Sequence, residues 1–255
     1  MATDLQRVIV FGATGSFGSA LAAALCKEPF TVFAWVRAET LLGKKERLDT
    51  LRASGVEILV GDFASTSQLL SALAGIHTVV SCLSGAALKL QLQLLEAAKA
   101  AGFTFMHFFL PGLGELRSEL QRPPNSVQVF CDGQHRASFV SLEDAAALTA
   151  KAILDPRTLN KVVQIRPRGH HLTQPELIAL WRGISGEAVS QHPIASLVDS
   201  ISGSSGAARA RLQFMYYIWE RGCQSQVIPE HELEASELYP DLSLMSPKVY
   251  LESLL

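Results

Sequence analysis

Three spaced glycines lie near the amino terminus, in Gly12-Ala13-Thr14-Gly15-Ser16-Phe17-Gly18. A β-rich run precedes them and a segment of helical composition follows, which is the context that gives this spacing a physical meaning. Gly12 permits a tight turn, Gly15 lets the backbone approach a pyrophosphate, and Gly18 lets a helix pack on a strand. The helix amino terminus adds unpaired N–H groups and positive potential. Against the alternative of a turn without a ligand, we expect a dinucleotide site with these contacts: Gly12, Thr14, Gly15, Ser16, Phe17 and Gly18.

The residues after the second predicted strand, 31–36, decide which dinucleotide binds. An acidic residue there would hold a ribose 2′-hydroxyl, whereas a basic residue would hold a 2′-phosphate. Arg37 stands at this point, and Lys44 and Lys45 follow within reach of the same phosphate. A solvated helix start is the alternative reading of these cations, and Glu39 keeps NAD open. The sequence favours NADP(H), bound by Arg37 and Lys44.

Two polar residues follow later predicted strands and are further candidate cofactor contacts. Asp62, after the strand at 56–60, could lie near the adenine, although capping of the next helix alone would explain it. Ser81 lies at the carboxyl end of the strand at 77–82, where open α/β sheets bind ligands. Small residues at such strand ends are also ordinary turn residues.

Strands and helices alternate along the first part of the chain at the spacing of a doubly wound sheet. The alternation stops at 110–136, where proline and glycine favour irregular chain, and then resumes. We expect an α/β fold with a Rossmann-type, mostly parallel sheet and a small, mainly helical C-terminal lobe. The predicted domains are a dinucleotide-binding domain at 1–155, with the loop 110–136, and a partly interleaved substrate lobe at 156–255. The further predicted strands are 7–11, 103–109, 138–140 and 162–165, and the helices are 16–27, 42–53, 67–74, 87–101, 142–154 and 174–183, the last capped by Thr173.

Composition excludes several other classes of protein. Lys plus Arg number 22 and Asp plus Glu number 24, and without a long basic run we expect no nucleic-acid partner. The four cysteines are far apart and lack metal-ligand or redox-pair spacing, so we expect free thiols and no metal. No apolar run approaches the roughly 18 residues of a membrane span. A cytoplasmic protein without a membrane partner is the expectation, and a homodimer is left open.

Taken together, these residues resemble the isoflavone reductase-like family, which includes pinoresinol-lariciresinol and phenylcoumaran benzylic ether reductases and belongs with the NmrA-like atypical short-chain dehydrogenases. The resemblance covers nearly the whole chain. Beside the glycine run and Val36-Arg37, its most specific segments are Asp155-Pro156-Arg157-Thr158-Leu159-Asn160-Lys161 and Glu234-Ala235-Ser236-Glu237-Leu238-Tyr239-Pro240. It implies an NADPH-dependent reductase of plant-type phenolics. The residues that match the family's cofactor contacts are Gly12, Gly15, Gly18, Arg37 and Lys44.

One departure from the family concerns proton transfer. In the family, the strand after the fourth helix leads into a helix that carries the catalytic lysine, and another strand follows. This sequence has one strand, 103–109, where two are expected, and the lysine-bearing helix is absent. Because a strand–helix–strand step returns in the same direction, deleting a whole step leaves the later strands parallel. The sheet can therefore still form.

Two residues are weak candidates for a replacement acid. Lys89, at the start of a predicted helix, could face the nicotinamide, although a helix lysine usually faces solvent. His107 lies near the carboxyl end of a central strand and could line the pocket, although a structural histidine is the commoner case. The pair His170-His171 is expected in a strand-to-helix loop.

Three functions follow from these observations. The first is an NADPH-dependent reductase of an aromatic, phenolic or polyketide-like secondary metabolite, with its proton from water, the substrate or a relocated side chain. The second is an NmrA-like protein that binds NADP(H) and signals redox state without turnover. The third is a pseudoenzyme or a non-redox catalyst that uses the same pocket. The aromatic side chains expected to line that pocket, against the alternative of core packing, are Phe108, Phe109, Phe214, Tyr217 and Trp219.

Overall fold

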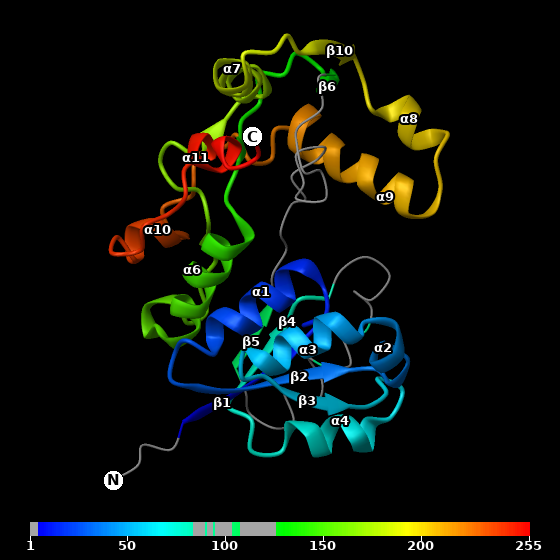
Figure 1. Cartoon of the computed structure of the whole chain (residues 1–255), viewed down its shortest axis with the longest axis vertical. Coiled ribbons are helices and arrows are strands. Elements are labelled where there is room, and N and C mark those ends of the chain that lie inside the picture. Colours follow the sequence, from blue (N-terminus) through cyan, green and yellow to red (C-terminus); the bar gives the residue numbers. More distant parts are fainter. Residues whose placement is uncertain (1–4, 84–89, 91–93, 95–103, 108–125) are drawn as a thin grey trace. The chain divides into compact units, whose positions relative to one another are not determined.

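The computed structural model describes residues 5–83, 90, 94, 104–107 and 126–255 (Figure 1). The chain divides into two compact units, the first of Met1–Leu110 with Thr149–Leu154 and the second of Pro111–Leu148 with Asp155–Leu255. One cut of this division lies between Leu154 and Asp155, beside the predicted boundary, and residues 111–148 group with the second unit. Helix α6 (Leu142–Leu154) contributes to both units.

A parallel five-stranded sheet in the order β3-β2-β1-β4-β5 forms the centre of the first unit. The chain builds outward from β1 to β3, then crosses to the other side of β1 to add β4 and β5. The point where the strand order reverses, between β1 and β4, is where open α/β sheets bind ligands. The predicted doubly wound fold is therefore confirmed. The strands are β1 (Gln6–Phe11), β2 (Phe30–Val36), β3 (Glu57–Val60), β4 (Thr78–Ser81) and β5 (Thr104–His107).

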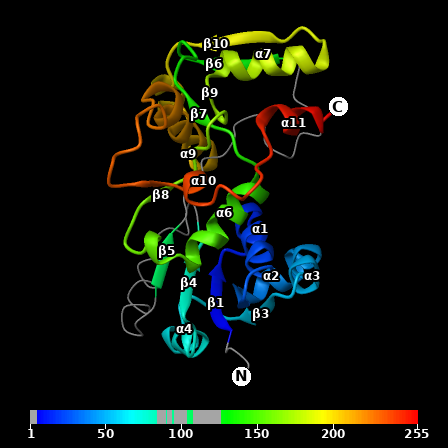
Figure 2. The ribbon, with the colours of Figure 1, turned by 90° about the vertical axis from the view of Figure 1, so that its left-hand side faces the viewer.

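Helices cover both faces of this sheet (Figure 2). Helices α1 (Ser16–Leu25) and α3 (Lys45–Ala53) lie on one face, and α4 (Thr66–Leu73) lies on the other. The helix predicted at 42–53 is in fact two, α2 (Ala38–Gly43) and α3, because Lys44 between them leaves the helical conformation, with φ −136° and ψ 40°.

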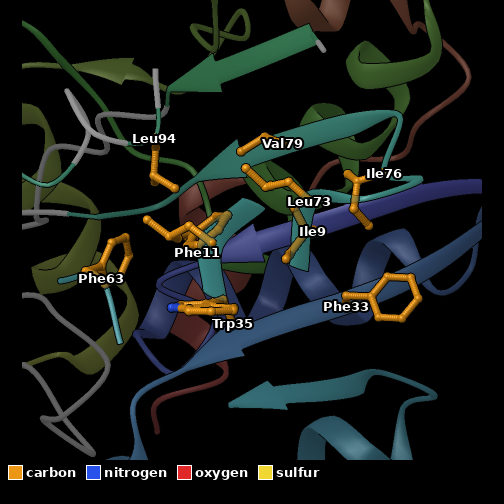
Figure 3. Close-up of a cluster of buried hydrophobic side chains, with 10 residues drawn as sticks. Ile9, Phe11, Phe33, Trp35, Phe63, Leu73, Ile76, Val79 and Leu94 are labelled. Atoms are coloured by element: carbon orange, nitrogen blue, oxygen red, sulfur yellow. The ribbon is translucent and has the colours of Figure 1, made fainter. Parts of the chain in front are cut away.

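A cluster of apolar side chains packs between the sheet and α4 (Figure 3). Phe11 lies at its centre, with its ring centroid 5.9 Å from that of Trp35 and 5.5 Å from that of Phe63. Since the opposite face of the sheet is also buried, the central strands are mostly apolar, as in Phe30–Val36, where Thr31 is the exception. The members of the cluster are Ile9, Phe11, Phe33, Trp35, Phe63, Leu69, Leu73, Ile76, Val79 and Leu94.

The second unit contains pairs of short strands. Strand β6 (Ser126–Phe130) pairs in parallel with β10 (Ser190–Ile194). Strand β8 (Val163–Gln164) pairs in parallel with β11 (Leu233–Glu234), and β7 (Ala137–Ser138) pairs antiparallel with β9 (His171–Leu172). The helical segments are η3 (Pro156–Thr158), α7 (Gln174–Ser185), α8 (Val198–Ser202), α9 (Gly206–Met215), η4 (Tyr216–Glu220), α10 (Ala235–Leu238) and α11 (Pro247–Glu252).

Strand β6 corrects part of the prediction that 110–136 is irregular loop. The run Ser126–Phe130 alternates polar residues with the valines 127 and 129, which is a strand pattern, but proline and glycine nearby favoured a loop. Its partner β10 was not predicted because its residues are mostly exposed and show no apolar alternation. Each of these two strands forms because it pairs with the other, far away in the sequence. Local propensity alone therefore did not predict the pair.

The amino end of α7 confirms the predicted cap. The Thr173 hydroxyl accepts a hydrogen bond from the Glu176 N–H at 3.2 Å, and the Glu176 carboxylate accepts one from the Thr173 N–H at 2.9 Å. The same carboxylate binds the Arg136 guanidinium at 2.7 and 2.9 Å.

One expectation nearby was wrong, because His171 lies in β9 and not in a loop. Its Nε2 faces the Gln224 carbonyl oxygen at 2.7 Å.

The two C-terminal segments that carry the family resemblance meet in the second unit. The Asp155 carboxylate binds the Arg157 guanidinium at 2.5 Å and accepts a hydrogen bond from the Tyr239 hydroxyl at 3.0 Å. The Arg166 N–H donates to the Glu234 carboxylate at 2.8 Å, beside the β8–β11 pair. These contacts link the two segments to each other. Asp155 and Arg157 precede β8 and Tyr239 follows β11, and we refer to these three residues as the β8–β11 clamp.

No helix in the described part of the chain is both long enough and apolar enough to cross a membrane. The same residues contain no group of three or more His, Cys, Asp and Glu side chains placed to hold a metal ion.

Candidate dinucleotide-binding site

The glycine loop joins β1 to α1 at the carboxyl edge of the sheet. Gly12 has φ 85°, a conformation that residues with a side chain rarely adopt. A Cβ on Gly12 would lie 2.8 Å from the Cys82 carbonyl oxygen, and a Cβ on Gly18 would lie 2.2 Å from the Gly12 carbonyl oxygen. Both distances are far shorter than a van der Waals contact, so the loop requires glycine at these two positions.

The amino terminus of α1 is open to an anion. The Gly15 N–H donates to the Gly12 carbonyl at 3.0 Å and closes the turn, and both Gly15 and Ser16 are exposed. No side chain of the described residues caps this helix, and a helix amino terminus carries the positive potential that attracts an anion. Thr14 and Phe17 are half-buried on either side of these two residues. The loop therefore has the backbone and the field that a pyrophosphate needs.

Three cations lie along this edge of the first unit. The Lys44 ammonium donates to the Thr14 carbonyl oxygen at 3.3 Å, which brings its charge to the glycine loop itself. The Arg47 guanidinium donates to the Ser19 hydroxyl at 3.1 Å, one turn further along α1. Sequence reasoning missed Arg47, which lies in the first turn of α3, the helix that begins directly after Lys44.

Arg37 directly follows β2 and lies at the amino end of α2. Its guanidinium lies 3.2 Å from the Glu39 carboxylate, and the two side chains are 61% and 66% exposed. An ion pair this exposed contributes about 0–1 kcal/mol of stability. A phosphate with two negative charges can therefore compete with Glu39 for Arg37.

Asp62 orders the turn after β3. Its carboxylate accepts a hydrogen bond from the Ala64 N–H at 3.0 Å, and its own N–H donates to the Gln68 side chain at 2.9 Å. The helix cap considered for Asp62 belongs to Ser65, whose hydroxyl accepts from the Gln68 N–H at 3.4 Å. Asp62 remains exposed at the edge of the sheet that carries the glycine loop.

Ser81 is the last residue of β4 and is fully buried. It pairs in register with Phe11 of β1, directly before the glycine loop, and with His107 of β5. Its hydroxyl has no hydrogen-bond partner among the described residues. Burial raises the pKa of the neighbouring Cys82 thiol to about 12, so this group stays uncharged beside the loop.

The other candidates separate into three groups. The backbone of His107 ends β5, whereas Lys89, Phe108 and Phe109 lie outside the described residues. Trp219 is buried and stacks on Phe139 at 6.3 Å, so its role in the second unit is core packing. The remaining two expected pocket residues are Phe214, half-buried beside the same core, and Tyr217, which is 58% exposed.

Comparison with known proteins agrees with this architecture. The NmrA-like family matches residues 4–130 and 103–248. The chain belongs to this family. Among individual relatives of this NmrA-like protein, the isoflavone reductase homolog A622-like of Nicotiana tabacum is 26% identical, over 97% of this chain and 97% of the relative. Pinoresinol reductase 1 of Arabidopsis thaliana is 28% identical, over 99% and 98%. The solved structure of AtPrR2 with NADP+ and (+)pinoresinol has a TM-score of 0.82 at 25% identity, over 99% of this chain and 100% of that chain.

The NmrA-like chain is shorter than these relatives inside the aligned region. The alignment to the Nicotiana tabacum relative runs over 304 positions, whereas this chain has 255 residues. At least 304 − 255 = 49 positions of the alignment therefore have no counterpart here. The two family matches overlap at 103–130, which includes the stretch where the sequence predicted a missing strand–helix step.

Proposed function

We propose that this NmrA-like chain is an NADPH-dependent reductase of an aromatic, phenolic or polyketide-like secondary metabolite. The observation that carries the proposal is the glycine cradle at the end of β1, with Lys44 bound to its Thr14 carbonyl at 3.3 Å and Arg37 exposed nearby. A small-molecule substrate of this class is in keeping with the relatives, which include a pinoresinol reductase.

Each part of the site has a role in this proposal. The N–H groups at the start of α1 would hold the pyrophosphate, and Arg37 with Lys44 would hold the 2′-phosphate. Asp62, at the end of β3, would lie on the adenine side. NADPH supplies a hydride when it is bound. The contacts proposed within the glycine loop are Gly12, Thr14, Gly15, Ser16, Phe17 and Gly18.

Reduction of a phenolic substrate of this kind also requires a proton or electrostatic stabilisation next to the atom that accepts the hydride. Ser81 and His107 end adjacent strands in register, at the edge that carries the glycine loop. The Ser81 hydroxyl is fully buried and has no hydrogen-bond partner among the described residues, so it is able to bind a ligand group at this edge. We therefore propose that Ser81 contacts the cofactor at this edge of the sheet. For the replacement acid, we rank His107 before Lys89.

A second function, NADP(H) binding without turnover, is favoured by one specific observation. At least 49 aligned positions of the relative have no counterpart in this chain, and the family matches overlap where the lysine-bearing helix is expected. A positioned general acid contributes about 10²–10⁴-fold to rate. Loss of such a segment would leave the cofactor cradle intact and remove most of the activity on the usual substrates of the family.

An assay of NADPH oxidation against a panel of lignan and isoflavone substrates separates the two functions. For the reductase we expect slow but saturable turnover that falls at least tenfold in His107→Ala, while cofactor affinity is unchanged. Lys89→Ala is the matched control, because we rank it lower. Turnover lost in Lys89→Ala alone would reverse this ranking. NADPH binding without turnover on any substrate would favour the binding protein over the reductase.

A further inference from the structure

An acidic residue, Glu39, is paired with one of the cations beside the proposed cofactor site. Glu39 is the second residue of α2, and its carboxylate lies 3.2 Å from the Arg37 guanidinium. Lys44 and Arg47 instead contact neutral oxygens, the Thr14 carbonyl and the Ser19 hydroxyl. Within the part of the chain that the structure describes, Arg37 is thus the one of these three cations that is paired with a carboxylate.

This pair faces solvent, with the two side chains 61% and 66% exposed, so a ligand can reach it. A 2′-phosphate that binds Arg37 must either displace Glu39 or lie beside it. Two negative charges about 4 Å apart repel in water, and they repel more strongly where water is displaced. Glu39 therefore opposes the binding of the phosphorylated cofactor.

The same carboxylate has the opposite effect on the cofactor without the phosphate. An acidic residue after the second strand is the group that accepts hydrogen bonds from a ribose 2′-hydroxyl. Glu39 lies two residues beyond Arg37. The 2′-phosphate of one cofactor and the 2′-hydroxyl of the other would therefore bind at the same short segment. An acid in the first turn of a helix is also favourable for the helix itself, but that effect would not distinguish the two cofactors.

We propose that Glu39, by its ion pair with Arg37, is a specificity-determining residue that narrows the preference of this chain for NADPH over NADH. The inference rests on the proposed function, since it requires the cofactor to bind at this edge. It predicts that the wild-type chain accepts both cofactors, with a smaller preference than Arg37 and Lys44 alone would give.

The test is calorimetric titration of wild type, Glu39→Gln and Glu57→Gln with NADPH and NADH, and with 2′,5′-ADP and 5′-AMP as fragments. Glu57 begins β3 and pairs in register with Phe33, in the middle of β2, so its substitution makes the same change of charge without removing the acid that is paired with Arg37. For Glu39→Gln we expect the NADPH-to-NADH affinity ratio to rise about fivefold, and the same rise for the two fragments. The rise should shrink at high salt, and Glu57→Gln should leave the ratio unchanged.

Each other outcome overturns a defined statement. An unchanged ratio in Glu39→Gln, including an equal loss of affinity for both cofactors, would overturn the role of Glu39 and leave the proposed function intact. A wild-type chain that binds neither cofactor would overturn both. A rise of the same size in Glu57→Gln would mean that net charge, and not the Arg37 pair, sets the preference.

Discussion

The cations of the site differ in what holds them, and this difference determines what each can do for a ligand. Lys44 and Arg47 are anchored on oxygens of the glycine loop and of α1. They place positive charge at a fixed position beside the pyrophosphate site. Arg37 is held by Glu39 alone among the described acids, and its planar guanidinium can offer two parallel hydrogen bonds to a phosphate. We therefore expect Arg37 to have the largest influence on the choice of cofactor.

Replacement of Arg37 by alanine should weaken NADPH binding by about 10-fold to 150-fold, because each hydrogen bond to a charged group contributes roughly 1.5–3 kcal/mol. NADH binding should change little, since no phosphate contact is lost. Titration of Arg37→Ala with both cofactors measures this. Arg52→Ala is the matched control, because Arg52 lies on α3 and pairs with Asp49. Equal losses for both cofactors would show that Arg37 does not contact the 2′-phosphate.

At the level of single residues, sequence reasoning succeeded where the chemistry is local. The turn at Gly12 and the helix start at Ser16 follow from glycine spacing, and the structure has both. The contact of Arg47 with Ser19 depends on how α3 packs beside α1, which the sequence does not specify. The role of Asp62 was open for a different reason, because either Asp62 or Ser65 could have capped α4.

Among the elements, those of the first unit were the most predictable. Its parallel strands contain short runs of apolar, mostly β-branched and aromatic residues, a strong signal, and each strand was found within a few residues of its predicted position. The break between α2 and α3 was missed because Gly43-Lys44 lies in an otherwise helical composition. In the second unit, β6 and β10 depend on each other across the sequence, so no local pattern predicted the pair.

The contacts of Asp155 in the β8–β11 clamp predict how the free energy of unfolding changes at acid pH. Hydrogen bonds from Arg157 and Tyr239 lower the pKa of Asp155 to about 2, below the value of roughly 3.9 expected for an unfolded chain. A carboxyl group whose pKa is lower in the folded state stabilises above the unfolded pKa, and this contribution is lost as the pH falls through the folded pKa. The free energy of unfolding should therefore decrease between about pH 4 and pH 2 through this group.

Urea unfolding of wild type and Asp155→Asn across this range measures the effect. The wild type should lose stability more steeply with falling pH than Asp155→Asn, which has no carboxyl group to protonate at this site. Burial raises the pKa of the Tyr239 phenol, so it remains a donor throughout, and Tyr239→Phe should reduce the same slope. Asp241→Asn, an exposed acid nearby in sequence, is the control. Parallel curves for wild type and Asp155→Asn would contradict the role of the clamp.

For the whole molecule, the main feature is an internal loss of length. The alignment to the Nicotiana tabacum relative spans 97% of that relative, but at least 49 of its positions have no residue in this chain. Strand β5 nevertheless pairs in parallel with β4, and the order of the sheet follows the doubly wound pattern. The predicted removal of a complete strand–helix step would leave the direction of the remaining strands unchanged. The proposed cofactor cradle, built from β1, α1 and α3, does not depend on the missing step.

The central claim is that this cradle binds NADPH in preference to NADH, and calorimetric titration of the wild-type chain with both cofactors tests it most directly. The fixed charge of Lys44 and the guanidinium of Arg37 should make NADPH the tighter ligand, with saturable binding at a single site. The preference should weaken as the salt concentration rises, because a phosphate contact is screened more than the rest of the cofactor. Equal affinities for NADPH and NADH, or no saturable binding of either, would contradict the account.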